Sequence, residues 1–190
     1  TPETKELMVS MSAKEAEEKS TTAEKKHRYT IRFRFWEQAL EAFRESSCNL
    51  YTNINPSKDH WLSAGSGVRG VPYSLISCKN EARVELSISR AETIENKYIF
   101  DKLLEEHRNK IEQDFGQELT WERLDDKKAS RIKFICPFES YNEENWPQII
   151  DWLIEHMTRF EVALKDPLSM VNDQLKQWLQ SEVEDLEAAE

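Results

Sequence analysis

The sequence has little glycine and little cysteine: four of its 190 residues are glycine and three are cysteine. Three of the glycines lie together at Gly65, Gly67 and Gly70, so one short stretch holds most of the residues that tolerate unusual backbone angles. The cysteines are far apart and odd in number, and they lack zinc-site spacing, which argues against a zinc finger and against a disulfide framework. We therefore expect reduced thiols.

No stretch approaches eighteen consecutive apolar residues, so the sequence predicts no transmembrane helix and no membrane partner. The first residues also lack the charged and then apolar pattern of a signal peptide. The chain begins at Thr1 without a methionine, which we interpret as a trimmed start or as the tail of a longer protein. With 33% charged and 38% hydrophobic residues, we expect a soluble, cytoplasmic protein.

Local catalytic motifs are missing as well. The sequence contains no zinc-protease, serine-hydrolase, phosphate-loop, dinucleotide or calcium-loop signature. One class of nuclease needs an acid and then an acid-x-lysine on a strand, but Glu85-Leu86-Ser87 and Glu122-Arg123-Leu124 both lack the lysine. We therefore expect a module without catalytic residues, metal or cofactor, which is not an enzyme by itself.

The net charge of −10 is uneven along the chain, because residues 165–190 hold seven acids and only two bases. Near the start, five bases follow one another without an intervening acid: Lys25, Lys26, Arg28, Arg32 and Arg34. This run has two interpretations. It could contact nucleic acid or an acidic partner, or it could be a solvated helix face paired with the acidic tail.

The first helix is predicted to begin at Thr21, because Thr21 and Glu24 have the spacing of a capping box. Aromatic and aliphatic residues then recur every three or four positions, which predicts one buried helix face. These residues are Tyr29, Phe33, Trp36, Leu40 and Phe43. A helix this apolar needs cover from a sheet, from a partner subunit or from both.

The middle of the chain alternates between strand and helix patterns. We predict strands at 61–64, 71–78, 82–88, 119–124 and 129–137. A second helix should begin at a Ser89/Glu92 capping box and end at Gly116. A third should run from near Asn142 to Asp166-Pro167. Arg83 and Glu85 share the polar face of the third strand, which should be solvated or line a shallow site.

This element order predicts an α+β fold: a mostly antiparallel five-strand sheet with helices on one face, in the order α-βββ-α-ββ-α, plus helical extensions at both ends. We expect residues 1–20 to be a linker or loose helix. Residues 21–165 should form a single α+β domain. Residues 166–190 should form an acidic amphipathic helical tail, in which Trp178 docks on its own domain or on a second copy.

Four stretches of the sequence together resemble a known family. They are RFRFWEQAL (32–40), HWLSAGSGVRG (60–70), ARVELSIS (82–89) and the run from Asn96 to Ile132 that contains IEQDFGQELTWERLDDKKASRI. Over about residues 28–164, the chain resembles the prokaryotic domain-of-unknown-function 4268 family. In that family the domain commonly follows a region resembling a restriction-endonuclease-like nuclease, and nothing in residues 1–30 resembles that region.

The resemblance implies an accessory or assembly module of nuclease-type proteins, with anti-phage defence as one setting. It assigns no catalytic residues, but it marks recurrent positions that include Glu85, Lys97, Trp121 and Arg131. We interpret Trp121 as core packing and Glu85 with Arg131 as an ion pair across the sheet. The enzymatic alternative places Glu85, Lys97 and Arg131 around a pocket.

Two further expectations concern partners. Lys25, Lys26, Arg28, Arg32 and Arg34 could contact nucleic acid. Alternatively, the chain could form a homodimer that binds other proteins, because its element order is similar to that of type III secretion chaperones, and because its first helix is unusually apolar. Topology alone does not decide between these functions.

Overall fold

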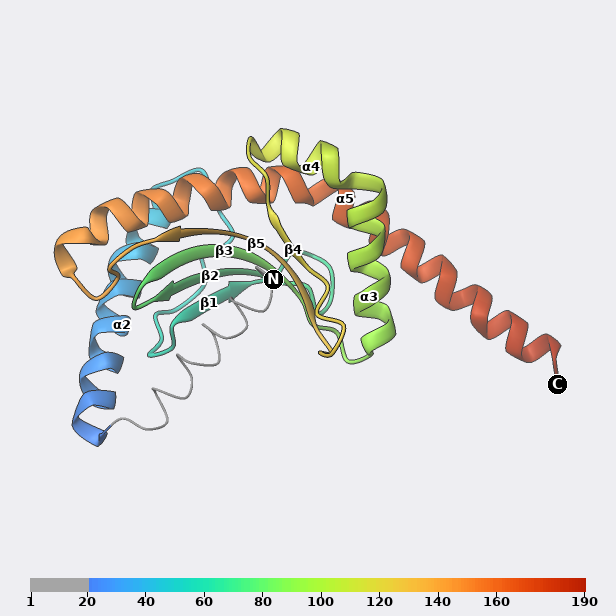
Figure 1. Ribbon diagram of the computed structural model, residues 1–190, viewed down its shortest axis with the longest axis horizontal. Coiled ribbons are helices and arrows are strands. Elements are labelled where there is room, and N and C mark those ends of the chain that lie inside the picture. Colours follow the sequence, from blue (N-terminus) through green and yellow to red (C-terminus); the bar gives the residue numbers. More distant parts are fainter. Residues whose placement is uncertain (1–20) are drawn as a thin grey trace. The chain divides into compact units, whose positions relative to one another are not determined.

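The computed structural model describes residues 21–190, and the predicted linker or loose helix over residues 1–20 lies outside them. Figure 1 shows the helices and strands of this part of the chain. The helical elements are α2 (Thr22–Arg44), α3 (Thr93–Lys102), the π-helical segment η1 (Leu103–His107), α4 (Arg108–Phe115), the short 3-10 helix η2 (Glu143–Asn145) and α5 (Trp146–Ala188). The strands are β1 (Trp61–Ala64), β2 (Tyr73–Cys78), β3 (Glu81–Ile88), β4 (Thr120–Glu122) and β5 (Ser130–Pro137).

The five strands form one sheet in the order β1-β2-β3-β5-β4, so β4 is an edge strand. β4 pairs antiparallel with β5, and Trp121 lies opposite Ile132 while Glu122 lies opposite Arg131. The predicted α+β class, the mostly antiparallel five-strand sheet and the element order are confirmed. β2 and β3 are buried along most of their length, so they supply much of the core.

α2 begins with the predicted capping box. The Glu24 amide donates to Thr21 Oγ1 (3.2 Å), and the Thr21 amide donates to a Glu24 carboxylate oxygen (3.0 Å). Trp36, Leu40 and Phe43 of the predicted face are buried, and Phe35 is buried beside them at 3% exposed, whereas Phe33 is 43% exposed and was wrongly placed on this face. The indole N–H of Trp36 donates to the Asp59 carbonyl at 2.8 Å, which fixes this face against the loop before β1.

The polar face of β3 is not solvated. Arg83 and Glu85 are only 6% and 7% exposed, and they form an ion pair at 3.5 Å. The solvated alternative is therefore wrong, and the shallow site stays a prediction. Charged side chains can be buried on such a face when they pair with each other.

The second helix begins later than predicted and is not uniform. Its N-cap is Glu92, without a side-chain cap, while Ser89 donates its backbone N–H to the Gly70 carbonyl at 2.8 Å. The capping box predicted at Ser89 is therefore wrong, because that residue closes the glycine-rich loop instead. The wider turns of η1 separate α3 from α4. Gly116 ends α4 in the left-handed conformation (φ 96°), as predicted.

α5 contradicts the predicted stop at Asp166-Pro167, because it continues through Pro167 to Ala188. A proline inside a helix removes one backbone hydrogen bond and strains the preceding turn. Here the apolar stripe continues across that position, and Leu164, Leu168, Val171 and Leu175 are each at most 1% exposed. Burial of this stripe, at about 25 cal/mol per Å² of apolar surface, offsets the proline.

The described residues divide into two compact units. One contains residues 21–64, then Ser74–Glu85 and Phe134–Thr158, and the other contains Gly65–Tyr73, Leu86–Lys133 and Arg159–Glu190. The predicted division at residue 165 stays a prediction, although α5 has no break there. None of the helices within residues 21–190 has the length and apolarity to cross a bilayer.

Candidate functional site

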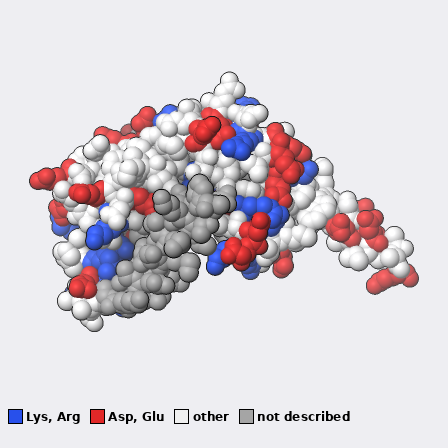
Figure 2. Space-filling model, viewed as in Figure 1, with Lys and Arg blue, Asp and Glu red and all other residues white. Residues whose placement is uncertain are grey.

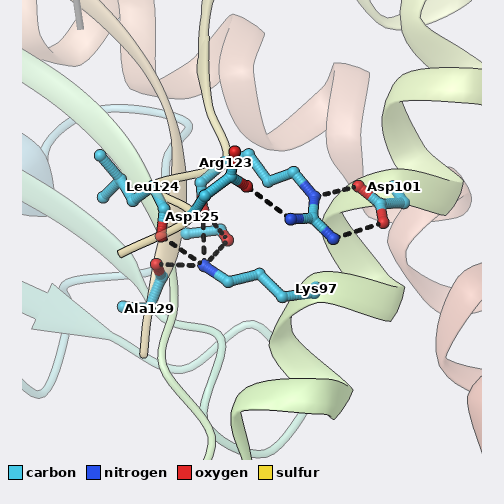
Figure 3. A network of polar contacts seen from close by, with 7 residues as sticks. Lys97, Asp101, Arg123, Leu124, Asp125 and Ala129 are labelled. Carbon is cyan, nitrogen blue, oxygen red and sulfur yellow. Dashed lines mark hydrogen bonds and ion pairs between the residues drawn. The ribbon is translucent and has the colours of Figure 1, made fainter. Parts of the chain in front are cut away.

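The candidate residue Lys97 lies on α3 and reaches into the turn between β4 and β5 (Figure 3). Its ammonium group donates to three backbone carbonyls, those of Arg123 (2.6 Å), Leu124 (2.9 Å) and Ala129 (2.9 Å). A fourth contact joins it to Ser130 Oγ at 2.9 Å. An ammonium has three protons, so these four oxygens occupy its donor capacity completely.

The same ammonium is largely withdrawn from water, since Lys97 is 9% exposed. Burial and, after it, the charge of Arg123 lower the pKa of Lys97. The four oxygens act in the opposite direction, because hydrogen bonds accepted from the charged form favour that form. The cluster therefore holds a cation by carbonyl dipoles rather than by a carboxylate.

Asn96, the neighbour of Lys97 on α3, extends this arrangement and is fully buried. Its amide nitrogen donates to the carbonyls of Lys128 (3.0 Å) and Arg90 (3.1 Å), and its amide oxygen accepts from the Arg90 backbone N–H (2.7 Å). Two adjacent side chains of one helix turn thus hold the backbone on both sides of α3. We call Asn96, Lys97 and the turn 123–130 the lysine clamp.

Arg123 completes the clamp on its outer side. Its guanidinium makes two parallel bonds to Asp101, from Nε at 2.8 Å and from Nη2 at 3.1 Å, and a third contact to Asp125. Asp101 lies one helix turn after Lys97 on α3, so the same helix face presents an ammonium and a carboxylate to the turn. Arg123 is 43% exposed, and solvent screening makes this pair weaker than the contacts of Lys97.

The clamp imposes an uncommon backbone conformation on the turn. Leu124 has φ 55°, and it is the residue other than glycine with a positive φ within residues 21–190. A leucine in this region is strained because its Cβ approaches the backbone. The Leu124 carbonyl accepts both from Lys97 and from the Lys127 backbone N–H (2.9 Å), and these bonds hold the strained residue in place.

A second buried cluster lies at the pairing of β4 with β5. Arg131 donates from Nε to Glu122 at 3.0 Å, and Lys133 also contacts the Glu122 carboxylate. Glu122 and Lys133 are both fully buried. Burial lowers the pKa of Lys133. The predicted pairing of Arg131 with Glu85 joins residues of different units and stays a prediction.

Trp121 lies in the same strand and is 8% exposed. Its ring packs edge-on against Phe100 of α3, with centroids 6.1 Å apart. The Glu112 carboxylate accepts from the Leu119 backbone N–H (2.6 Å) and from the Trp121 indole N–H (3.4 Å). Trp121 therefore packs β4 against the second helix, and Glu112 fixes the start of that strand.

The basic run of α2 does not form one continuous surface. Arg32 is 7% exposed, and it donates to the Lys58 carbonyl (3.4 Å) and to the Tyr141 hydroxyl (3.2 Å). Arg34 pairs with Glu143 at 2.6 Å and lies over the Trp146 ring. Arg32 is therefore largely buried and Arg34 is paired at the surface, and the predicted contact of the run with nucleic acid stays a prediction.

The remaining members of the run lie in the first turns of α2. Lys26 is exposed, and Lys25 and Arg28 are half-buried. The start of α2 thus carries basic side chains, of which Lys26 is the exposed one. These basic residues lie at the start of α2, whereas the end of α5 has an acidic surface, which is red in Figure 2.

The lysine clamp and the second cluster, Glu122 with Arg131 and Lys133, both lie within a stretch that matches a known family. A family model described as domain of unknown function (DUF4268) matches residues 31–168. The chain belongs to the DUF4268 family. A search of curated proteins found no match to it. The family description names no reaction, substrate or partner.

Some members of these clusters could not be found from the sequence. Lys97 and Arg131 were candidates, whereas Asp101, Glu122 and Lys133 were missed as functional or structural positions. Their partners are distant in sequence: Asp101 meets Arg123 22 residues away, and Lys97 meets backbone carbonyls 26 to 32 residues away. Across residues 21–190, the structure shows no group of three His, Cys, Asp or Glu side chains placed to hold a metal ion.

Proposed function

We propose that this DUF4268 chain is a non-catalytic accessory or assembly module of a nuclease-type protein, with anti-phage defence as one setting. The observation that carries the proposal is the Lys97 ammonium, whose protons are all taken by oxygens of the turn 123–130. A nucleophilic or proton-transferring lysine needs a free position toward a substrate. The nuclease setting is supported by the family resemblance alone.

The clamp favours a rigid scaffold over a reaction centre. Three buried or half-buried polar side chains hold one backbone segment against another: Lys97 and Asn96 hold the turn, and Glu112 holds the start of β4. Within this proposal, contact with nucleic acid is confined to Lys25, Lys26 and Arg28. Three cations on one helix turn support weak binding that depends strongly on salt concentration.

A filter-binding experiment tests the nucleic-acid part. The chain and its Lys25→Glu/Lys26→Glu variant would be titrated against duplex and single-stranded DNA between ~50 and ~300 mM salt, with Mg²⁺ present to reveal cleavage. We expect weak binding by the unmodified chain at low salt, loss of binding in the variant and no cleavage. Cleavage that remains proportional to the chain through purification would refute the non-catalytic proposal.

A second candidate function, a protein-binding homodimer, is favoured by the end of α5. Trp178 stacks on Tyr98 of α3, with centroids 4.8 Å apart, so the predicted docking of this tryptophan occurs within the chain. Beyond it, the apolar stripe continues to Val183 (53% exposed) and Leu186 (69% exposed). Figure 1 shows these last turns extending past α3.

We propose that a second copy covers these residues. The end of α5 is acidic, whereas the first turns of α2 are basic, so the two surfaces are complementary between two copies in a two-fold arrangement. Light scattering at micromolar concentration should give a dimer mass at ~50 mM salt, and a Val183→Ser/Leu186→Ser variant should be monomeric. A monomer mass for the unmodified chain would exclude this function.

A further inference from the structure

A hollow of ≈ 290 Å³ lies between the glycine-rich loop and the second half of α5, within one unit. Its polar lining comes from Arg69, Arg90, Lys176 and Asn172, and its apolar lining from Leu175 and Leu179. Neither cluster of the candidate site contributes to it. This volume is close to the lower end of the range for small-molecule sites.

The charge of this hollow is opposite to that of the chain. The sequence has 36 acids and 26 Lys and Arg residues, yet three of the lining residues are bases and none is an acid. Arg90 is paired with Glu95 at 3.0 Å. Within residues 21–190, the structure gives the side chains of Arg69 and Lys176 no ion pair, and both are exposed at the rim.

The wall of the hollow is preformed by Arg90. Its Nη1 donates to the Arg69 carbonyl at 2.8 Å, and its stem packs so closely on Gly70 that a Cβ there would lie 2.8 Å from Arg90 Cγ. Ser89 closes the same loop through the Gly70 carbonyl. Gly70 (φ 75°) is therefore required both by its backbone angle and by the close approach of Arg90.

The hollow is also connected to the lysine clamp. Asn96 accepts a hydrogen bond from the Arg90 backbone N–H at 2.7 Å, so the residue that fixes the turn 123–130 also fixes the wall of the hollow. On the opposite side, Leu175 is 1% exposed and forms a rigid part of α5. A ligand would thus meet a surface that is organised before binding, which reduces the entropy lost on association.

We propose that this hollow binds a terminal phosphate monoester, either of a free mononucleotide or at the 5′ end of a nucleic acid strand. Arg69 and Lys176 supply two exposed cations for a dianion, and Asn172 supplies an amide donor. Arg presents paired donors that match phosphate oxygens, and Lys adds a compact charge. The half-buried Leu179 gives an apolar contact for the sugar or base.

Titration calorimetry at constant ionic strength tests this proposal with AMP, adenosine and inorganic phosphate as probes. We expect saturable binding of AMP, weaker binding of phosphate and none of adenosine. In the Arg69→Gln/Lys176→Gln variant, AMP binding should weaken about 100-fold, or about tenfold for each charged contact removed. The exposed pair Lys79→Gln/Lys165→Gln removes the same charge elsewhere, and it should bind AMP as the unmodified chain does.

A variant that fills the hollow distinguishes binding inside the hollow from general attraction between the phosphate and basic side chains. Asn172→Phe leaves the charge unchanged and should abolish AMP binding while the melting temperature stays within a few degrees. Two dinucleotides, one with a 5′-phosphate and one with a 5′-hydroxyl, identify the source of the phosphate. Binding of the phosphorylated one supports a strand end, and binding of AMP alone supports a free nucleotide.

Three results would overturn the proposal. They are equal binding of both dinucleotides, equal weakening in both charge variants, and no saturable binding of any phosphate probe. The DNA titration of the Lys25→Glu/Lys26→Glu variant addresses a different surface. If the DNA titration shows no binding, the calorimetry with AMP still tests the hollow independently.

Discussion

Replacing Lys97 with methionine removes the ammonium of the lysine clamp and keeps most of the apolar stem. The carbonyls of Arg123 and Leu124 keep second donors, Ser130 Oγ (2.6 Å) and the Lys127 backbone N–H (2.9 Å). The Ala129 carbonyl and Ser130 Oγ each lose a charged donor. At about 1.5–3 kcal/mol for a hydrogen bond to a charged group, less the relief of a buried charge, the free energy of unfolding should fall by about 3 kcal/mol.

For a chain of this size, that loss corresponds to a melting temperature about 6–12 °C lower. Lys102→Met is the matched control, since Lys102 is on the same helix but pairs with Glu106 on the surface at 3.1 Å. An exposed pair of this kind contributes little to stability, because solvent screens it. Urea denaturation gives both free energies, and hydrogen exchange should show faster exchange of the amides of 123–130 in Lys97→Met only. Equal losses in the two variants would refute the role assigned to Lys97.

Three other variants examine the remaining interactions. Arg123→Ala should lower the free energy of unfolding by less than about 1 kcal/mol, because its pair with Asp101 is partly exposed; a double-mutant cycle with Asp101→Asn measures the coupling. Lys133→Met should cost about 3 kcal/mol by urea denaturation, since it leaves the buried Glu122 carboxylate without one of its cations, and Lys133→Met/Glu122→Leu should recover part of the loss. Burial raises the pKa of Cys78 to about 11, from an unfolded value of 9.0. The unfolded chain therefore releases this proton first, and stability should fall as the pH rises from 9 to 11, by about 2–3 kcal/mol, relative to Cys78→Ala measured in the same buffers.

The sequence predicted those parts of the fold that depend on local pattern. The capping box at Thr21, the left-handed Gly116 and the strands of the sheet all follow from residue type and spacing, and all are present. The errors arise where tertiary packing overrides local preference. Asp166-Pro167 predicts the end of a helix, but the buried stripe of α5 continues through Pro167.

The candidate site was less predictable for a related reason. Lys97 and Arg131 were identified as positions of interest, but the partners of Lys97 are mostly backbone carbonyls, which no residue type reveals. Alternation along β3 predicts a solvated face, because the pattern alone does not show that Arg83 and Glu85 form an ion pair. Arg69 and Lys176 lie far apart in sequence, so the hollow that they share had no local signal.

The lysine clamp also affects how the sequence of the turn 123–130 can vary during evolution. Lys97 recognises the main chain of the turn, and three of its four contacts are carbonyl oxygens. The side chains of Asp126, Lys127 and Lys128 are exposed, and the hydrogen bonds of Lys97 go to other residues of the turn. Their identities can therefore vary while the shape of the loop is retained. This gives the domain a fixed frame on which new recognition residues can be displayed without redesign of the fold.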